Sequence, residues 1–386
     1  MDQFDSIRPY NDDEVAAVLQ RLLADTDFLS MITQYRFPTA SRYIDWLLRP
    51  ITAWKLRKEI RKVHSVAALQ QRIEAYVEHS ISQVTDGISF SGIEHLQTGK
   101  PHLYLANHRD IVMDPAFVNY ALFQAKLSTP RIAIGDNLLQ RPFVSDLMRI
   151  NKSFIVHRSL TNRREKLTAF QLLSAYINHS ILHDQESIWI AQAEGRAKDG
   201  DDRTESAILK MFHLSRKDED FQAVIASLRL TPVAISYEYD PCDIAKAREL
   251  YIRATTGEYK KQIGEDDASI VLGITGYKGR VHVHFCPVLT TGFTDTKQLA
   301  QLVDQHIWRD YRLFPAHYLA WGMWEQRDSN LPVPDIKDVF DSQEILNAQQ
   351  HWQKRLDACP TEHRPYLIMQ YAMPVENQYR NTQLPT

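Results

Sequence analysis

The feature that most restricts the fold is a series of short apolar runs between Gly87 and Leu289, several of them separated by helical patterns. The runs, each a strand candidate, are Ile88–Phe90, Leu103–Ala106, Ile132–Ile134, Phe154–Val156, Ser187–Ala191, Pro232–Tyr237 and Val281–Phe285. Helical spacing of apolar residues is clearest over Asp114–Gln124 and Asn162–Leu182. Strands that alternate with helices form βαβ crossovers. The sequence therefore predicts an α/β fold with a mixed, mainly parallel sheet covered by helices.

The segments on either side of this core are predicted to be helical. Asn11 and Glu14 fit a capping box, and apolar residues recur behind them at helical spacing. Helical patterns return over Lys297–Tyr311 and Asp341–Leu356, and the polar segment Val375–Thr386 follows. We divide the chain into an N-terminal helical region (1–85), an α/β domain (86–295) and a C-terminal helical region with a tail (296–386).

The stretch Arg42–His64 combines aromatic and basic side chains. Trp46 and Trp54 lie among seven Lys and Arg residues and only two acidic residues. Pro50 is expected to break or kink the helix, which leaves a short basic helix after it. Aromatic anchors beside Lys and Arg are typical of a surface that lies on anionic lipid. A helix packed on the α/β domain produces the same pattern, so both interpretations stay open.

Composition excludes several classes of partner and cofactor. The 45 Lys and Arg residues against 48 Asp and Glu give a net charge of −3, so we expect no nucleic-acid partner. Three cysteines without a CxxC pair are too few for a disulfide framework and argue against a zinc site. We interpret His282 and His284 as strand residues, and Asp199, Asp201 and Asp202 as a solvated turn, rather than as metal ligands. We expect no metal site.

The sequence also indicates where the protein is located. The segment Met1–Pro9 carries two Asp and no apolar core, unlike a secretory signal. No apolar run reaches the roughly 18–20 residues that a spanning helix needs. Sparse cysteines fit a reducing compartment. We expect a cytoplasmic protein, with any membrane contact made peripherally through residues 42–64.

One polar segment follows a predicted strand in the manner of an active site. Asn107–Pro115 comes directly after Leu103–Ala106 and opens a helix, where α/β proteins place catalytic groups. A carboxylate that holds one ring N–H of His108 leaves the other nitrogen free to deprotonate an alcohol. Alternatively, Asp114 caps a helix that starts at Pro115, and His108 is a loop histidine. Serine-hydrolase elbows, P-loops, dinucleotide-binding turns and zincin helices are absent from the sequence.

Several sequence blocks occur in one order along residues 87–289 and resemble a known family. The blocks are Gly92–Leu96, Asn107–Arg109 with a downstream Asp, Gly135–Leu138, Phe154–Ser159, Ala193–Lys198 and Thr231–Ile235. They resemble those of the glycerolipid acyltransferases, which include glycerol-3-phosphate, dihydroxyacetone-phosphate and lysophosphatidate acyltransferases and carry N-H-x-S-x-x-x-D, G-D-N-L, F-F-I-R-R-S, E-G-x-R-S-R and P-V-x-I blocks. The resemblance implies the glycerol-3-phosphate acyltransferase-like α/β fold and no metal or redox cofactor.

The resemblance also implies the chemistry of the histidine. His108 would be the general base of a direct acyl transfer, without an acyl-enzyme, and Asp114 the carboxylate that orients it. Five residues separate His108 from Asp114, where the family has four. Asp110 is therefore a rival for the orienting carboxylate.

A substrate-phosphate site is implied by two further blocks. It maps to Arg158, with Arg196 and Lys198 near it. Glu194 and Gly195 belong to the same substrate-binding segment, and we expect Glu194 to be an orienting or structural carboxylate. Because the basic pair follows Glu194 and Gly195 one position earlier than in the family, the resemblance leaves open whether Arg196, Lys198 or both reach the substrate. Arg suits phosphate because its planar fork donates two parallel hydrogen bonds.

The function that the resemblance implies is fatty-acyl transfer, from acyl-CoA or acyl-carrier protein, to a hydroxyl of glycerol-3-phosphate or 1-acylglycerol-3-phosphate. The product would be lysophosphatidate or phosphatidate. The G-D-N-L and F-F-I-R-R-S blocks favour glycerol-3-phosphate, whereas the modest length suits either acceptor. Two alternatives stay open: an acyltransferase for another lysolipid or an amino-lipid, and a non-catalytic lipid- or phosphate-binding protein at the membrane surface.

Overall fold

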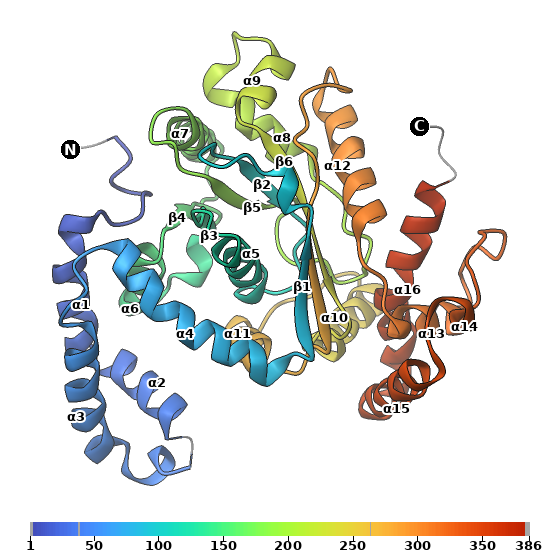
Figure 1. Ribbon diagram of the computed structural model, residues 1–386, viewed down its shortest axis with the longest axis horizontal. Coiled ribbons are helices and arrows are strands. Elements are labelled where there is room, and N and C mark those ends of the chain that lie inside the picture. The colour runs from blue at the N-terminus through green and yellow to red at the C-terminus, as the bar shows by residue number, and fades with distance from the viewer. Residues whose placement is uncertain (1–2, 38, 263, 383–386) are drawn as a thin grey trace. The chain divides into compact units, whose positions relative to one another are not determined.

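The computed structural model describes residues 3–37, 39–262 and 264–382 (Figure 1). The chain separates into two compact units. Unit 1 combines Met1–Val77 with Pro130–Ile177, and unit 2 combines Glu78–Thr129 with Asn178–Thr386. The division into regions 1–85, 86–295 and 296–386 stays a prediction.

Unit 1 is built from N-terminal helices and one pair of parallel strands. Its elements are α1 (Val15–Ala24), α2 (Thr26–Arg36), α3 (Ser41–Ile60), the start of α4 (Val66–Val84), β3 (Arg131–Gly135), α6 (Pro142–Ile150), β4 (Ser153–Val156) and the start of α7 (Arg163–Leu182). Strands β3 and β4 pair in parallel. The predicted capping box is confirmed, since the Asn11 N–H donates to Glu14 Oε2 at 2.7 Å. The apolar face of α1 packs into a buried cluster with Phe143 and Ile150 of α6.

Helix α3 runs through its proline. The one position with non-helical backbone angles inside it is Ile44, at φ −132° and ψ 32°. The expected break at Pro50 is therefore wrong. A proline removes a single backbone donor from the helix, and the backbone of α3 stays helical around Pro50 despite that loss. The basic and aromatic side chains between Asp45 and Ile60 consequently lie along one continuous helix.

Unit 2 holds a mixed sheet that confirms the predicted fold class. Its strands are β1 (Gly87–Ser91), β2 (Leu103–Ala106), β5 (Ile188–Ala191), β6 (Leu230–Tyr237) and β7 (Arg280–Phe285), in the order β1-β7-β6-β2-β5. The pairs β1–β7, β2–β6 and β2–β5 are parallel, and β6–β7 is antiparallel. Every residue of β6 is buried, as expected for a central strand with both faces covered.

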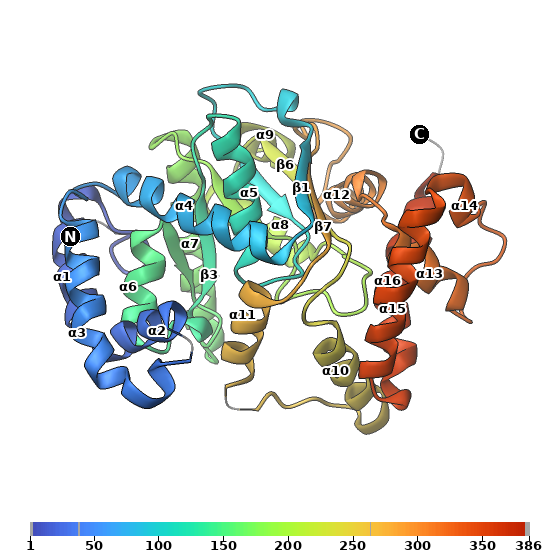
Figure 2. The same ribbon diagram turned by 60° about the horizontal axis from the view of Figure 1, so that its bottom comes forward.

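Helices cover this sheet on both sides. Helix α5 (Met113–Gln124) packs against β7 and α12 (Thr296–Asp310) packs against β6, and they flank the strands in both views (Figures 1 and 2). The other helices of unit 2 are α8 (Ser206–His213), α9 (Phe221–Ser227), α10 (Asp243–Thr256), α11 (Glu265–Thr275), α13 (Pro315–Met323), α14 (Ile336–Val339), α15 (Ser342–Ala358) and α16 (Arg364–Asn381).

The C-terminal helices form a core of their own within unit 2. Helix α13 packs against α15 and α16, around buried Trp352 and Tyr371. The polar segment predicted from Val375 onward is helical as far as Asn381, where α16 ends, and Val375 itself is buried in this core. Residues 383–386 lie outside the described residues. None of the helices in the described ranges has the length and apolar content needed to cross a bilayer.

Candidate active site

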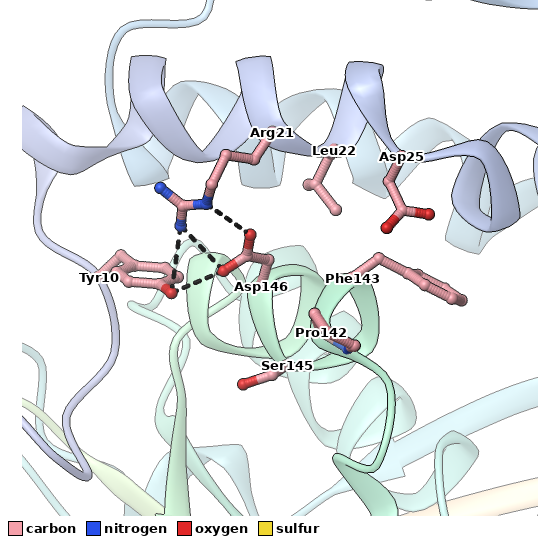
Figure 3. A pocket seen from close by; sticks show the side chains of 8 residues that line it. All are labelled: Tyr10, Arg21, Leu22, Asp25, Pro142, Phe143, Ser145 and Asp146. Atoms are coloured by element: carbon pink, nitrogen blue, oxygen red, sulfur yellow. Dashed lines mark hydrogen bonds and ion pairs between the residues drawn. The ribbon is translucent and has the colours of Figure 1, made fainter.

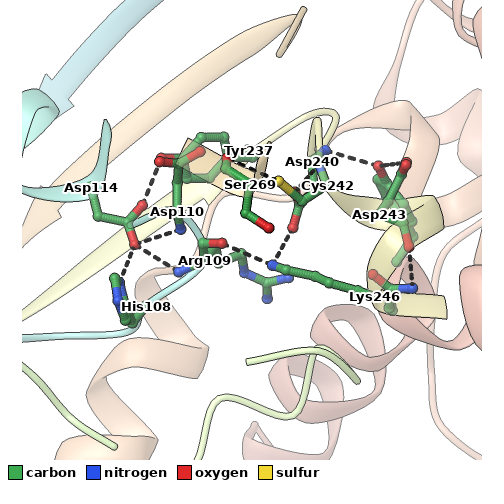
Figure 4. A network of polar contacts seen from close by, with 12 residues as sticks. His108, Arg109, Asp110, Asp114, Tyr237, Asp240, Cys242, Asp243, Lys246 and Ser269 are labelled. Carbon is green, nitrogen blue, oxygen red and sulfur yellow. Dashed lines mark hydrogen bonds and ion pairs between the residues drawn. The ribbon is translucent and has the colours of Figure 1, made fainter. Parts of the chain in front are cut away.

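His108 and Asp114 are in direct contact. His108 follows β2, Asp114 is the second residue of α5, and His108 Nδ1 lies 2.8 Å from Asp114 Oδ2 (Figure 4). The extra residue between them is absorbed by the turn at residues 109–112. The ring of His108 also meets Trp189 of β5 edge to face, at 5.8 Å between centroids. Of the two candidate carboxylates, Asp114 is therefore the one that contacts the histidine.

The Asp114 carboxylate is completely buried and held by several donors. Its Oδ2 also accepts from the backbone N–H groups of Arg109, at 2.6 Å, and Asp110, at 3.0 Å. Its Oδ1 accepts from the Tyr237 hydroxyl at 2.6 Å. Burial and the nearby carboxylates raise the pKa of Tyr237 well above its ordinary value, so the phenol stays a donor. An acceptor held in this way keeps the proton of His108 on Nδ1 and leaves Nε2 as the basic nitrogen.

Asp110 binds backbone N–H groups at the start of α5 and does not contact His108. Its Oδ1 accepts from the backbone N–H groups of Val112 and Met113, at 3.0 and 2.9 Å, at the start of α5. Asp110 therefore binds the two N–H groups that lead into α5, whose N-cap is Val112, and the alternative in which Asp114 is the N-cap is wrong. Burial and the charge of Asp114 raise the pKa of Asp110. Its Oδ2 has no hydrogen-bond partner in the described part of the chain.

The loop that carries His108 is tied to the sheet by the preceding residue. The Asn107 side-chain amide donates to the Ile235 carbonyl at 3.0 Å and accepts from the Ile235 N–H at 2.7 Å. This pair of hydrogen bonds imitates one step of strand pairing with β6. Because Asn107 is completely buried, the adjacent histidine is held by the core of unit 2.

A buried ion pair supports the other side of the same loop. Arg109 Nη2 donates to Asp202 Oδ2 at 2.5 Å, and both side chains are buried. The interpretation of Asp202 as part of a solvated turn is therefore wrong. The Lys246 ammonium donates to the Arg109 carbonyl at 2.8 Å and to Asp240 at 2.5 Å. Although burial opposes ionisation, Lys246 holds the pKa of Asp240 below its usual value.

The segment Glu194–Lys198 runs beside the histidine loop. The Ala197 N–H donates to the His108 carbonyl at 2.8 Å. Lys198 Nζ lies 3.3 Å from Glu249 Oε1, and burial lowers the pKa of Lys198. The half-buried Arg196 guanidinium and the exposed Glu194 carboxylate have no hydrogen bond or ion pair to any described residue. Of the two basic residues, Arg196 is the one with its donors available.

Gly195 gives this segment its open turn. Its φ is +84°, a left-handed conformation that favours glycine, and an added Cβ would meet no atom within 4 Å. The space next to the backbone at Gly195, between Glu194 and Arg196 in the sequence, is therefore not filled by other atoms of the protein. A side chain at this position would be disfavoured by backbone strain alone.

In unit 1 the structure brings together the blocks Gly135–Leu138 and Phe154–Ser159. Asp136 Oδ1 accepts from the backbone N–H groups of Arg158 and Ser159, at 3.0 and 3.2 Å, and its Oδ2 accepts from the Ser159 hydroxyl at 2.5 Å. Burial opposes ionisation, but these hydrogen bonds hold the pKa of Asp136 below its usual value. The Arg158 side chain passes over Gly135, where an added Cβ would lie 3.1 Å from its Cδ. Its exposed guanidinium has no partner within the described ranges.

Several residues of this arrangement were not identified from the sequence. Tyr237, Trp189 and Lys246 contact the loop from positions 81 to 138 residues away from His108. For Tyr237 the sequence does offer one local indication: it is the last residue of the strand that contains the P-V-x-I block, and active-site residues of α/β proteins are often found at strand ends. Trp189 lies in a strand whose four residues are all buried, so burial does not single it out.

A separate cavity in unit 1 contains none of the candidate residues. It has a volume of about 470 Å³ and lies between α1 and α6 (Figure 3). Arg21 Nη2 and the Tyr10 hydroxyl both bond Asp146 Oδ1 there, at 2.9 and 2.6 Å. These contacts join α1 to α6 and account for the polar wall of the cavity.

Comparisons with known proteins bear on residues 87–235, which match the family model described as Acyltransferase. Two curated proteins named glycerol-3-phosphate acyltransferase, from Pseudomonas putida (strain W619) and Pseudomonas entomophila (strain L48), are each 25% identical over 248 residues. The match covers 62% of this chain, which spans only 27% of the length of each relative. The crystal structure of a 1-acyl-sn-glycerophosphate acyltransferase from Thermotoga maritima aligns with TM-score 0.38 and 13% identity, over 63% of this chain and 78% of that one.

The family match covers β1, β2, β5 and β6 and includes both the histidine loop and the Glu194–Lys198 segment. The ordered blocks of the sequence lie within the same residues. Residues 87–235 are therefore similar to the Acyltransferase family, and the two curated relatives extend this likeness to 62% of the chain.

Proposed function

We propose that the protein transfers a fatty acyl group from acyl-CoA or acyl-carrier protein to a hydroxyl of glycerol-3-phosphate or 1-acylglycerol-3-phosphate, as a step of phospholipid biosynthesis. The observation that carries the proposal is the contact between His108 Nδ1 and buried Asp114. The clamp of Asp136 on Arg158 and Ser159, together with the names of the two curated relatives, favours glycerol-3-phosphate as the acceptor.

The proposed mechanism uses His108 as a general base. Nε2 takes the proton of the acceptor hydroxyl while the oxygen bonds to the thioester carbon. Collapse of the tetrahedral intermediate then breaks the carbon–sulfur bond, and the imidazolium returns its proton to the leaving thiolate. Asp114 stabilises the transient imidazolium and holds the ring in place. No acyl-enzyme is formed, and the chain's own residues supply the acid and the base.

The acceptor's phosphate is proposed to bind arginine. Arg158 and Arg196 are separate candidates, because each has a guanidinium group without a partner among the described residues. Lys198 is less suited, because its ammonium is paired with Glu249. A planar guanidinium donates two parallel hydrogen bonds to phosphate, which a lysine cannot do.

We further propose that α3 contacts the cytoplasmic face of a membrane. The exposed fractions of Tyr43, Trp46 and Trp54 are 82%, 68% and 65%, and Leu47 and Ile51 are also exposed. These positions recur at intervals that place them along the helix surface. The basic residues beside them complement anionic lipid: Arg42, Arg49, Lys55, Arg57, Lys58, Arg61 and Lys62. Exposed tryptophans favour this interpretation over a helix packed on the rest of the protein.

The proposed function is tested by measuring thiol release from purified full-length protein supplied with lipid vesicles. Acyl-CoA and acyl-carrier protein serve as donors, and glycerol-3-phosphate and 1-acylglycerol-3-phosphate as parallel acceptors. We expect release that depends on the acceptor and falls by about 10²–10⁴ in His108→Ala. The matched control is His79→Ala, an exposed histidine on α4, which should retain full turnover.

Each outcome has a definite meaning. The acceptor that supports release identifies the step. Release that survives His108→Ala in folded protein would refute the mechanism. If no thiol is released with either donor and either acceptor, the result would instead favour an acyltransferase for another lysolipid or amino-lipid, or a non-catalytic lipid-binding protein.

A further inference from the structure

Three different ligand groups converge at one end of β7 in unit 2. His284 lies on β7, Cys286 directly follows it, and Asp310 is the last residue of α12. One ligand atom from each lies within 4.8 Å of the others. Asp310 Oδ2 is 3.5 Å from both Cys286 Sγ and His284 Nε2. None of these side chains takes part in the proposed acyl transfer.

The two separations that involve Asp310 match those between ligands on one metal ion, and the third ligand atom lies within 4.8 Å. Tetrahedral zinc holds nitrogen and oxygen at about 2.0 Å and sulfur at about 2.3 Å, which puts neighbouring ligand atoms about 3.3–3.8 Å apart. Imidazole, thiolate and carboxylate together are a borderline-soft set that suits zinc better than calcium or magnesium. We propose that His284, Cys286 and Asp310 form a zinc-type divalent-metal site.

The orientation of His284 supports this proposal independently of the distances. Its Nδ1 is 2.7 Å from the Ser91 hydroxyl, while its Nε2 is buried and has no hydrogen-bond partner. A metal-binding histidine is characteristically held in this way, with one nitrogen bonded to a protein oxygen and the other free for the metal. The neighbouring His282 is excluded as a ligand, because Ser89 and Ser91 occupy both of its nitrogens at 2.8 Å.

His95 lies next to His284 but outside the group of three ligand atoms that are within 4.8 Å of one another. Its Nδ1 donates to the Phe285 carbonyl at 2.7 Å, which leaves Nε2 free, and its ring lies 6.1 Å from that of His284 between centroids. The short helix Ile93–His95 is held close to β7 by Gly92, where an added Cβ would lie 2.0 Å from the Phe285 carbonyl oxygen. The backbone thus keeps His95 next to His284.

The charges balance when the ion binds. The Cys286 S–H bond breaks, sulfur bonds to the metal, and the proton leaves to solvent. The thiolate and the Asp310 carboxylate then offset the two positive charges of the ion. Arg309 currently bonds both oxygens of Asp310, at 2.9 and 2.6 Å. Arg309 Nη2 also lies 2.9 Å from His306 Nδ1. Because Arg309 is 51% exposed, its whole guanidinium can turn to solvent when the ion replaces it on Asp310.

The test is a titration of the full-length protein with Co²⁺, followed by displacement with Zn²⁺. Thiolate coordination gives an intense charge-transfer absorption, and we expect one equivalent to produce it and Zn²⁺ to abolish it. Ser91→Ala should weaken Zn²⁺ binding by about 10- to 100-fold through loss of the histidine's orientation, and Cys286→Ser should weaken it by more. The matched control is Cys359→Ser, a buried thiol of the C-terminal core that should leave binding unchanged.

The spectrum of the unmodified protein decides the proposal even where a variant fails to fold. Absence of the charge-transfer band would overturn it. A band that survives Cys286→Ser in folded protein, or that disappears in Cys359→Ser, would also overturn it by assigning the thiolate elsewhere. Circular dichroism of each variant establishes its folding, and the readout does not depend on acyl transfer.

Discussion

The Tyr237 hydroxyl bonds the Asp114 oxygen that His108 leaves free, at 2.6 Å. The end of β6 and the start of α5 are therefore joined through the carboxylate that orients the proposed base. Tyr237 acts through Asp114 and is a positioning residue rather than a catalytic one.

Tyr237→Phe should lower both stability and turnover. It leaves Asp114 Oδ1 buried without a donor, which costs about 1–3 kcal/mol in the free energy of unfolding. We expect kcat to fall by less than the 10²–10⁴ that loss of the base costs, with the KM of donor and acceptor unchanged. Urea denaturation and steady-state kinetics measure the two effects. An unchanged kcat would show that the hydroxyl contributes to folding alone.

The two carboxylates near His108 should differ sharply in their effect on rate. Asp114→Asn should reduce kcat by about 10⁴-fold. The neutral amide can present its NH₂ group to Nδ1 instead of an oxygen, so the imidazole loses the tautomer and the orientation that catalysis needs. Asp110→Asn keeps an oxygen to cap α5 and should leave most of the turnover. Parallel kinetics of the two variants test this assignment. A larger loss in Asp110→Asn would identify Asp110 as the functional carboxylate.

Removal of the Arg196 guanidinium should weaken binding of the acceptor. A hydrogen bond to a charged group is worth about 1.5–3 kcal/mol, so Arg196→Ala should raise the acceptor's KM by about 10- to 100-fold with little change in the donor's KM. Lys198→Met is the matched comparison, since Lys198 is already paired with Glu249, and it should mainly reduce stability. Equal effects of the two substitutions on KM would contradict the distinction.

Loss of the exposed tryptophans should release the protein from anionic vesicles. Burying one large apolar side chain is worth about 1.5–3 kcal/mol, so Trp46→Ala with Trp54→Ala should reduce partitioning by at least about tenfold. Cosedimentation with phosphatidylglycerol vesicles measures this, and added salt should weaken binding further. The control substitutes Val271 and Leu272, an exposed apolar pair on α11. Binding that is unaffected by loss of the tryptophans would favour a packing role for α3.

Stability should fall on mild acidification through His317. Its Nδ1 accepts from the Phe314 N–H at the start of α13, and burial with the charge of Arg109 lowers its pKa to about 3. The unfolded chain, with an ordinary histidine pKa near 6.5, binds the proton first. The stability that neutral His317 contributes is therefore present above pH ~6.5 and is lost as the pH falls toward ~3.

His317→Gln keeps an acceptor for the Phe314 N–H and removes this titration. Between pH 6.5 and pH 5, it should lose about 2 kcal/mol less unfolding free energy than the unmodified protein does. Urea unfolding at the two pH values measures the difference, with exposed His79→Gln as control. Parallel losses in His317→Gln and the unmodified protein would show that other groups dominate.

Local patterns in the sequence predict the strands well. All seven apolar runs are strands, and β2 begins and ends where its run does. Burial of a short run bounded by turn residues is a local property. The helical end of α16 was not predicted, because Val375 packs into a core formed by distant side chains. The helical path of α3 through Pro50 was also not predicted.

The candidate site is only partly predictable for the same reason. The position of His108 after a strand follows from its neighbours, but the choice between Asp110 and Asp114 depends on how the turn folds around a carboxylate. Asp202 looks like a turn residue, and its burial requires Arg109, 93 positions earlier. Tyr237 joins the site across 123 positions. Such pairings have no periodicity that a single sequence displays.

The hydrogen bonds of Asn107 to Ile235 bear on how the protein loses activity when heated. If His108 lay on a loop that unfolds locally, turnover would be lost at a lower temperature than the one at which the domain unfolds. Here Asn107, the residue before the histidine, is hydrogen-bonded to β6 in the way a neighbouring strand would be. The loop that carries His108 can therefore separate from the sheet only when β6 itself unfolds. Thermal inactivation and global melting of unit 2 should therefore coincide, and turnover should not wait for a loop to close.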